Sequence, residues 1–286
     1  MTLHPSSANT GIHFVRCDAD GREIEIPAIY ESVTATMLCT IIGDPNGAFV
    51  ATIEHLMAAL RAMCVDNVRI EIDGAEVPVM DGSAHDFVTS IAEVGLMPQT
   101  ARRQYIRIEK PIRVDMDESF AELTPYDGSH FDVEIDFSDP AIGRQRFTTD
   151  MTPEIFESEI SRARTFGFLK DVEKLWELGY ALGSSFENSV VIGDDGVVNQ
   201  DGLRFGDEFV RHKLLDAVGD LALSGAPILG SYRSYRGGHR VNSLMLKALF
   251  ENTDSWSYVE SAPSVAAGAS HAVMPEASAA LSPSTR

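Results

Sequence analysis

Cysteine is scarce in this sequence: its 286 residues include only three, Cys17, Cys39 and Cys64. An odd, unclustered set fits a reducing compartment, and it suits neither a disulfide framework nor a cysteine-rich zinc site. The sequence also lacks any run of about 20 apolar residues, the length that a membrane span needs. Residues 1–11 carry no apolar stretch of the kind that a signal peptide has. We therefore expect a cytoplasmic protein without a membrane span.

Positive charge is in short supply as well, because 23 Lys and Arg stand against 43 Asp and Glu, a net charge of −20. A surface of this sign repels a phosphate backbone, so no nucleic-acid partner is expected. Glycine-rich phosphate loops, His-Glu-x-x-His and serine-centred nucleophile elbows are also absent. A hydrophobic content of 44% is ordinary for a globular protein. The sequence leaves the oligomeric state open, and a monomer is the expected state.

The strongest pattern lies in residues 207–223, which read DEFVRHKLLDAVGDLAL. At about 100° per residue, a helix here gathers Val, Leu, Val and Leu on one face. His212, Asp216 and Asp220 fall together on the opposite face, one turn apart. His and Asp at i, i+4 can hold one metal ion, because neighbouring turns bring both heads to the same point. A solvated polar face would explain the same pattern equally well.

Residues 52–64 predict another amphipathic helix, with an apolar stripe at i, i+3, i+4 and i+7. His55 lies roughly 155° from the centre of that stripe, among small alanines that leave room for a second layer. Glu54 is its neighbour in sequence. From the pattern alone, His55 is either a structural histidine on a second buried face or a ligand.

The remaining pattern divides the chain into two units of strands and helices. Further strands are predicted at 12–16, 24–29, 36–42, 67–73, 105–114, 120–123, 130–137, 189–192, 197–199 and 228–235, and further helices at 83–94, 152–164, 168–176 and 241–250. Ser83 with Asp86 resembles a capping box. A short polar link at 97–103 predicts α+β domains at 1–100 and 101–260. Residues 261–286 are rich in Ala, Ser and Pro and predict a disordered tail.

Six stretches, in combination and in order, resemble the bacterial UDP-3-O-acyl-N-acetylglucosamine deacetylase family, which commits precursors to lipid A. They are TIEHL at 52–56, MDGSA at 80–84, SRARTFGF at 161–168, NQDGLRF at 199–205, FVRHKLLDAVGD at 209–220 and GH at 238–239. The resemblance runs from about residue 10 to residue 258. With the element pattern, it implies an α+β fold of two similar domains. Each has two helices on a mainly antiparallel sheet, the helices are sandwiched between the sheets, and the second domain carries a small insert.

The resemblance implies a Zn²⁺ site made by His55, His212 and Asp216. This assignment agrees with the helix geometry, because the off-stripe His55 and the polar face of the later helix would meet between two layers. Three protein ligands leave a position for water, which is the catalytic pattern of zinc. Such an ion polarises the amide carbonyl and lowers the pKa of water toward ~7.

The resemblance also implies the catalytic side chains. Glu54 would act as general base, and the alternative is an exposed helix carboxylate without a catalytic role. His239 would be the cation that stabilises the oxyanion and protonates the leaving amine, with Asp220 orienting it and keeping it protonated. Thr165 matches a hydroxyl donor to the oxyanion. Lys213 would supply positive charge near the sugar or phosphates of an acylated UDP-sugar substrate.

Substrate contacts are implied for several apolar residues. Phe137 matches an aromatic position near uracil, although its strand face suits a core role equally well. The insert at about 166–199 would build the acyl passage, in which case its apolar side contacts a fatty chain rather than its own sheet. The residues expected there are Phe166, Phe168, Leu169, Val172 and Trp176.

By the resemblance, we expect that this sequence lacks a segment that members of the family normally carry, with a first strand and a Gly-Leu-His-Ser-Gly-like loop. Loss of that strand would expose a sheet edge. Two further hypotheses therefore stand beside a zinc deacetylase. One is a catalytically impaired, N-terminally truncated protein that binds nucleotide sugars or acyl chains. The other is a zinc amidohydrolase of a different substrate.

Overall fold

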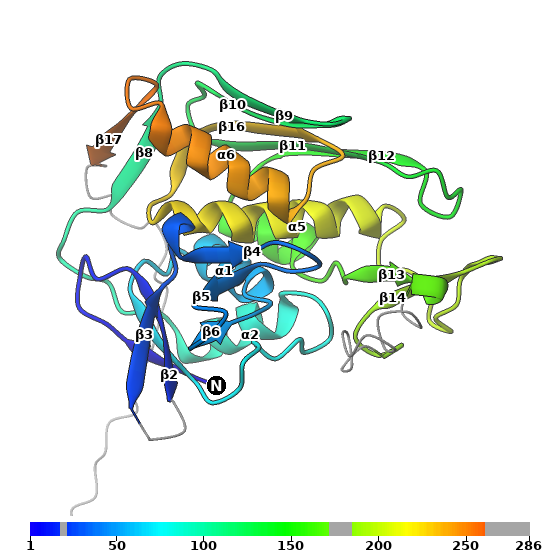
Figure 1. Cartoon of the computed structure of the whole chain (residues 1–286), viewed down its shortest axis with the longest axis horizontal. Helices are drawn as coiled ribbons and strands as arrows, with labels where there is room; N and C mark the ends of the chain where they lie inside the picture. Colours follow the sequence, from blue (N-terminus) through cyan, green and yellow to red (C-terminus); the bar gives the residue numbers. More distant parts are fainter. Residues whose placement is uncertain (18–21, 172–184, 261–286) are drawn as a thin grey trace, which may run out of the picture.

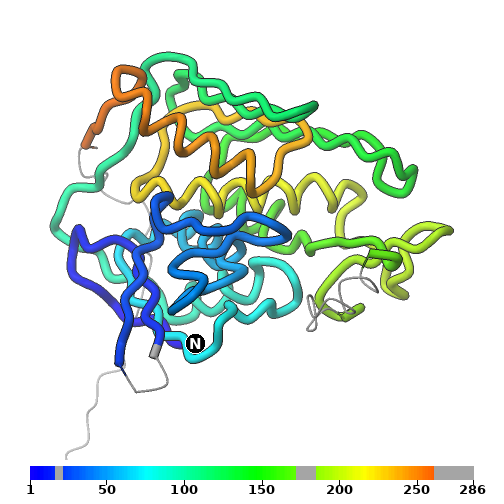
Figure 2. Tube along the Cα trace, in the orientation of Figure 1, coloured from blue at the N-terminus to red at the C-terminus, as the bar shows by residue number. Residues whose placement is uncertain are grey.

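The computed structural model describes residues 1–17, 22–171 and 185–260. In Figure 1 three long helices, α1 (Glu54–Ala62), α5 (Glu208–Leu221) and α6 (His239–Glu251), run between a large sheet at the top of the view and smaller sheets below. Figure 2 follows the same path as a tube and shows segments from both halves of the chain side by side in the helical layer. The α+β fold class predicted from the sequence is confirmed.

Within the described residues, the first half of the chain forms a four-stranded sheet in the order β1-β7-β2-β3. Its strands are β1 (Thr2–Pro5), β2 (Ile12–Cys17), β3 (Glu23–Pro27) and β7 (Val68–Ile72). A smaller sheet of β4 (Val33–Ala35), β5 (Ile41–Gly43) and β6 (Phe49–Val50) follows a short 3-10 turn at Tyr30–Ser32. The second helix, α2 (His85–Val94), packs against α1.

The second half forms the large sheet, which has seven strands among the described residues. They are β8 (Gln104–Ile108), β9 (Ile112–Met116), β10 (Ser119–Thr124), β11 (Ser129–Asp136), β12 (Arg144–Asp150), β16 (Ile228–Tyr235) and β17 (Trp256–Glu260). The order is β12-β11-β16-β10-β9, and β8 pairs with both β16 and β17. Most pairs are antiparallel, but β16 runs parallel to β11 and to β8. Helices α5 and α6 pack on the inner face of this sheet.

The contact between α1 and α5 brings the two halves together, and Gly219 determines how closely they approach. A Cβ at this position would lie 2.0 Å from the backbone oxygen of Glu54. Only a glycine therefore allows the start of α1 to rest on the backbone of α5. Both helices are buried over most of their length. Their polar residues consequently lie inside the protein, which excludes the solvated-face interpretation of the α5 pattern.

Between β12 and α5 lies a segment of short elements. They are α3 (Pro153–Ile155), a π-helical turn (Phe156–Ile160) and a small sheet of β13 (Phe166–Phe168), β14 (Val190–Gly193) and β15 (Gly196–Val197). A 3-10 turn (Ala222–Ser224) follows α5. Val172 and Trp176 lie outside the described residues, as do most of the helix predicted at 168–176 and the tail at 261–286.

Three sequence predictions about single elements are wrong. The strand predicted at 36–42 survives only at its end, in β5, because Leu38 takes a left-handed φ of 70° that breaks an extended chain. The strand predicted at 105–114 divides into β8 and β9 around Pro111, which lacks an N–H for the ladder. The capping box predicted for Ser83 and Asp86 does not form: the hydroxyl of Ser83 accepts from the N–H of His85, where α2 begins, but the N–H of Ser83 donates to Asp81 instead of Asp86.

None of the helices in the described part of the chain is both long enough and apolar enough to cross a membrane.

Candidate active site

Two imidazoles and a carboxylate meet where α1 and α5 touch. His55 comes from the first turn of α1, and His212 and Asp216 come from successive turns of α5. Asp216 Oδ1 lies 3.7 Å from His55 Nε2 and 3.4 Å from His212 Nε2. Their candidate ligand atoms all lie within 4.8 Å of one another. The structure thus brings together the three residues predicted as metal ligands, each of them 4% exposed or less.

The bonding of this group fits a divalent ion. Among the described residues, neither His55 Nδ1 nor Asp216 Oδ1 has a hydrogen-bond partner, although both atoms are buried. His212 Nδ1 donates to the carbonyl of Ala163 at 3.1 Å, which leaves its Nε2 with a free lone pair. The other oxygen of Asp216 accepts from Lys213 at 2.8 Å. A buried carboxylate oxygen without a partner is costly, and a cation shared by Asp216 Oδ1 and the Nε2 atoms of the two imidazoles that face it would satisfy this oxygen.

The protonation states also suit metal binding, which needs neutral imidazoles and an ionised carboxylate. Burial, reinforced by the neighbouring imidazole, lowers the pKa of His55 to about 3. Burial likewise lowers the pKa of His212. Burial alone would raise the pKa of Asp216, but His212 and Lys213 lower it overall. The site therefore presents two nitrogen lone pairs and one negative charge at neutral pH.

Glu54 lies beside this group, one residue before His55, and it is buried rather than exposed. Its Oε2 accepts a hydrogen bond from the backbone N–H of Thr40 at 3.0 Å. Burial raises the pKa of Glu54 to about 7, against the opposing effect of the cation on His239. A carboxylate with a pKa near neutrality can both take up and release a proton under physiological conditions.

His239 and Asp220 form a hydrogen-bonded pair at the start of α6. His239 Nδ1 donates to Asp220 Oδ2 at 2.8 Å. The same oxygen accepts from Asn242 Nδ2 at 2.8 Å, and Asn242 in turn accepts from the hydroxyl of Tyr232 at 2.5 Å. Burial would lower the pKa of His239, but the charge of Asp220 raises it to about 10. This imidazole is therefore a cation at neutral pH, held by a chain of buried polar groups.

Lys213 and Thr165 complete the predicted polar set. The ammonium of Lys213 lies 5.6 Å from the ring centre of Phe166, in addition to its bond with Asp216. Thr165 is held by its backbone: its N–H donates to Gly82 at 2.7 Å, and its carbonyl accepts from Val190 at 2.8 Å. It lies two residues from Ala163, whose carbonyl contacts His212. Lys213 thus contacts the metal-ligand group directly, whereas Thr165 is connected to it through the backbone between residues 163 and 165.

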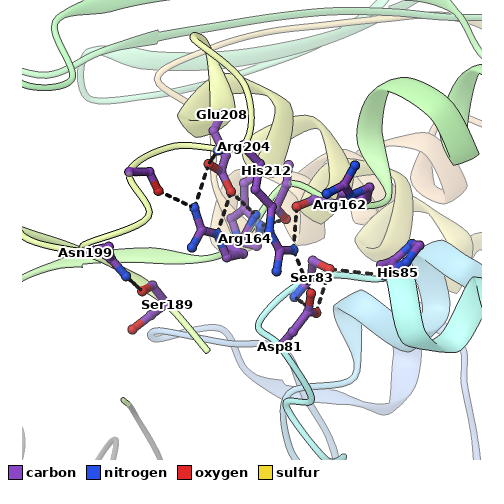
Figure 3. Close-up of polar contacts among 12 residues, drawn as sticks. Asp81, Ser83, His85, Arg162, Arg164, Ser189, Asn199, Arg204, Glu208 and His212 are labelled. Carbon is purple, nitrogen blue, oxygen red and sulfur yellow. Dashed lines mark hydrogen bonds and ion pairs between the residues drawn. The ribbon is translucent and has the colours of Figure 1, made fainter. Parts of the chain in front are cut away.

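An ion-pair cluster holds the surrounding loops, as Figure 3 shows. Buried Glu208 accepts from Arg164 at 2.9 Å and from the backbone N–H of Arg204 at 2.6 Å. Arg204 also reaches Asp81 at 2.6 Å, which ties the first half of the chain to the second. Burial alone would raise the pKa of Glu208, but the bonds from Arg164 lower it overall. This cluster joins the loop that carries Thr165 to the start of α5.

Aromatic side chains lie on the insert side of the ligands. The ring of Phe166 lies 6.1 Å from that of His212, and the ring of Phe137 lies 5.8 Å from Phe166 and 6.5 Å from Phe168. All three phenylalanines are partly buried and pack against the core. Leu169 follows them and is also partly buried. The ring of Phe137 therefore packs both against the core and against the aromatic rings on the insert side of the ligands.

Sequence reasoning missed several polar residues that support the site. Thr40, Asn242, Tyr232 and Glu208 are buried and contact predicted site residues or their neighbours. The two partners of these hydrogen bonds are far apart in sequence, by ten residues for Tyr232 and Asn242 and by 180 for Thr40 and Asp220, so local periodicity could not pair them. For Glu208, its place one turn before His212 was an available signal. For Thr40 the sequence holds no local signal.

The α+β fold and a buried His-His-Asp group, flanked by a carboxylate and a cationic imidazole, define a class: they are typical of a metal-dependent hydrolase. The chain matches the family described as UDP-3-O-acyl N-acetylglycosamine deacetylase (LpxC) over residues 1–251. Proteins named UDP-3-O-acyl-N-acetylglucosamine deacetylase in Brucella ovis, Brucella canis and Brucella melitensis are each 51% identical to it over 259 residues, or 90% of this chain and of each relative. The chain therefore belongs to the UDP-3-O-acyl N-acetylglycosamine deacetylase family, as its motifs indicated.

Proposed function

We propose that this protein is a zinc-dependent deacetylase that hydrolyses the N-acetyl group of UDP-3-O-acyl-N-acetylglucosamine in lipid A biosynthesis, releasing acetate and leaving a free amine. Membership of the deacetylase family supports the reaction and the substrate. The observation that carries the proposal is the buried group of His55, His212 and Asp216 with Glu54 directly beside it.

His55, His212 and Asp216 would hold the ion. When bound, Zn²⁺ supplies Lewis acidity toward the amide carbonyl and a water nucleophile at neutral pH. The protein supplies the rest of the chemistry. The bond from His212 Nδ1 to Ala163 fixes the ring and its tautomer, and the bond from Lys213 fixes the plane of the Asp216 carboxylate.

Proton transfer falls to the two groups on either side. Glu54 takes the proton of the attacking water, because its pKa of about 7 makes it a competent base near neutrality. His239, a cation through its bond to Asp220, stabilises the negative charge on the carbonyl oxygen and protonates the leaving amine. We assign the hydroxyl of Thr165 a second hydrogen bond to that oxygen.

For substrate binding we assign Lys213 to the anionic or sugar portion and the aromatic cluster of Phe137, Phe166 and Phe168 to the uracil and the entrance of the acyl passage. Lys213 lies next to a ligand and over the ring of Phe166, which supports this placement. Leu169 extends the apolar side of the passage. This assignment also gives the partly buried aromatic rings a function beyond packing.

We further propose that residues 1–100 and 101–260 act as two domains with the reaction between them. Strands β1–β7 build the sheets of the first unit and β8–β12, β16 and β17 the sheet of the second, which supports the division. We place the enzyme in the cytoplasm as a monomer. The unpaired Cys39 and Cys64 support a reducing compartment.

The decisive experiment measures acetate release from UDP-3-O-acyl-N-acetylglucosamine by purified protein, before and after chelation and after return of zinc. The proposal expects activity that disappears with the metal and returns with it. Activity that survives verified metal removal would exclude the metal role. Binding of the substrate without turnover would favour a catalytically impaired binding protein, and equal hydrolysis of simple N-acetylated sugars would favour a zinc amidohydrolase of another substrate.

A further inference from the structure

Thr40 lies between the two carboxylates that flank the candidate metal site and contacts both. Its backbone N–H donates to Oε2 of Glu54 at 3.0 Å, and its hydroxyl donates to Oδ1 of Asp220 at 2.6 Å. The residue is 2% exposed, so both bonds are shielded from bulk water. A single residue therefore bridges the proposed base and the partner of the proposed acid.

The local backbone explains how one residue can reach in two directions. Thr40 stands immediately before β5, where the chain leaves the bend at Leu38, so its N–H points to a side chain instead of a neighbouring strand. Its carbonyl accepts from the N–H of Ile53, at the start of α1, at 3.5 Å. The position of Thr40 is thus tied to the helix that carries Glu54.

The hydrogen bonds of Asp220 show what the hydroxyl of Thr40 contributes. Oδ2 of Asp220 accepts from both His239 and Asn242, whereas Oδ1 accepts from the hydroxyl of Thr40. Donors on both oxygens fix the plane of a carboxylate, and the plane determines where the imidazole that it binds must lie. Thr40, Asp220 and His239 also line the same small pocket.

We propose that Thr40 is a positioning residue, which holds Asp220, and through it His239, at a fixed place relative to Glu54. The inference rests on the proposed function, since it gives Glu54 and His239 the roles of base and acid. The two donors of Thr40 hold the carboxylates of Glu54 and Asp220 in a fixed position relative to each other, although these two residues belong to different halves of the chain. Catalysis that passes a proton from one side of the substrate to the other depends on such fixed geometry.

The test compares Thr40→Val with Thr40→Ser. Valine has the shape of threonine and keeps the backbone N–H, but it lacks the hydroxyl, whereas serine keeps the hydroxyl. Ser224→Ala is the matched control: Ser224 is also buried, and its hydroxyl bonds to the backbone oxygens of Leu221 and Ala226 at the end of α5. Kinetics with the acylated UDP-sugar are measured together with the zinc content of each variant.

We expect Thr40→Val to lower kcat by about 10- to 100-fold, the usual effect of removing an outer hydrogen-bond partner, with KM nearly unchanged. Thr40→Ser should recover most of kcat, and Ser224→Ala should retain it. A wild-type kcat in Thr40→Val would overturn the proposal. So would an equal loss in Thr40→Ser, or a loss of zinc from Thr40→Val, which would place its effect at the ligands instead.

A second readout needs neither zinc nor turnover. In metal-free protein labelled with ¹⁵N-histidine, the Nδ1–H of His239 that Asp220 accepts should give a distinct signal, assigned with a His239→Gln variant. Thr40→Val should shift that signal or speed its exchange with water, and Ser224→Ala should not. An unchanged signal would overturn the role of Thr40. Wild-type protein without deacetylase activity would refute the proposed function, and the NMR comparison would still decide the role of Thr40.

Discussion

Substitution of Gly219 by alanine tests whether the close contact of α1 and α5 builds the site. Intrinsic preference alone would make this change stabilising, because alanine is favoured over glycine in a helix by about 1 kcal/mol. The structure predicts the opposite. The added Cβ would lie 2.0 Å from the backbone oxygen of Glu54 and 3.1 Å from the backbone nitrogen of Ala58. These are main-chain atoms, so no change of rotamer can relieve the clash.

The magnitude follows from the distance. The helices must move apart by about 1 Å before the new methyl group reaches a tolerable contact, and overpacking of this kind costs about 1–3 kcal/mol. After the gain in helix preference, a net loss of up to about 2 kcal/mol remains, which for a chain of this size lowers Tm by up to about 4 °C. The same movement carries His55 away from Asp216. A displacement of about 1 Å in a catalytic site can cost about 100-fold in rate.

Calorimetry, zinc content and kcat together check this prediction. Gly206→Ala is the matched control, because Gly206 lies just before α5, has no left-handed φ, and has open space around its Cβ position among the described residues. It should behave as wild type. If Gly219→Ala instead raised Tm and kept full zinc content and kcat, the contact between the helices would not determine the geometry of the site.

Three further predictions concern single side chains. Glu54→Gln should lower kcat by about 10²- to 10⁴-fold with zinc retained, whereas Glu251→Gln, at the exposed end of α6, should not; steady-state kinetics of both variants check this. Asp216→Ala should weaken zinc binding, measured by competition with a chelator, by more than the roughly 10- to 100-fold that loss of an outer-shell partner costs. Because the pKa of Glu208 is lower in the folded protein than its ordinary value of 4.5, its contribution to stability is present above that pH and is lost as the pH falls through the folded-state pKa. Glu208→Gln leaves the buried Arg164 without its carboxylate, so it should lower the free energy of unfolding by about 3–5 kcal/mol at neutral pH. The stability of this variant should also depend less on pH than that of the wild type. Urea midpoints of the variant and the wild type that change in parallel from pH 3 to 7 would contradict this prediction.

Local periodicity predicted the helices that carry the site, because a repeat of 3.6 residues is a property of the segment itself. It placed His212 and Asp216 on one face of α5 and set His55 apart from the apolar stripe of α1. It could not give the distance between the two helices, which depends on Gly219 lying against a backbone far away in sequence. The metal role of the three residues came from the resemblance and stays a prediction.

The elements that sequence reasoning missed were those with a weak local pattern. Strand β12 carries polar residues on both faces, with Phe147 as its one aromatic residue, so its alternation is hard to see. The left-handed φ angle of Leu38 is unusual for a residue with a branched side chain, and the neighbouring sequence does not predict it. Thr40 follows this bend, and its partners come from α1 and α5. A polar residue in a predicted strand becomes informative only when the packing around it is known.

The pKa values of Glu54 and His239 are both raised, but for different reasons. Glu54 accepts a hydrogen bond from the neutral N–H of Thr40, so the cost of desolvation dominates and raises its pKa to about 7. His239 donates to a carboxylate at 2.8 Å, so the attraction outweighs desolvation and raises its pKa to about 10. An environment that makes one group a base and its neighbour a cation separates the two halves of acid–base catalysis. Thr40 is connected to both groups of this acid–base pair. Its N–H donates to Glu54, and its hydroxyl donates to Asp220, the carboxylate that keeps His239 charged.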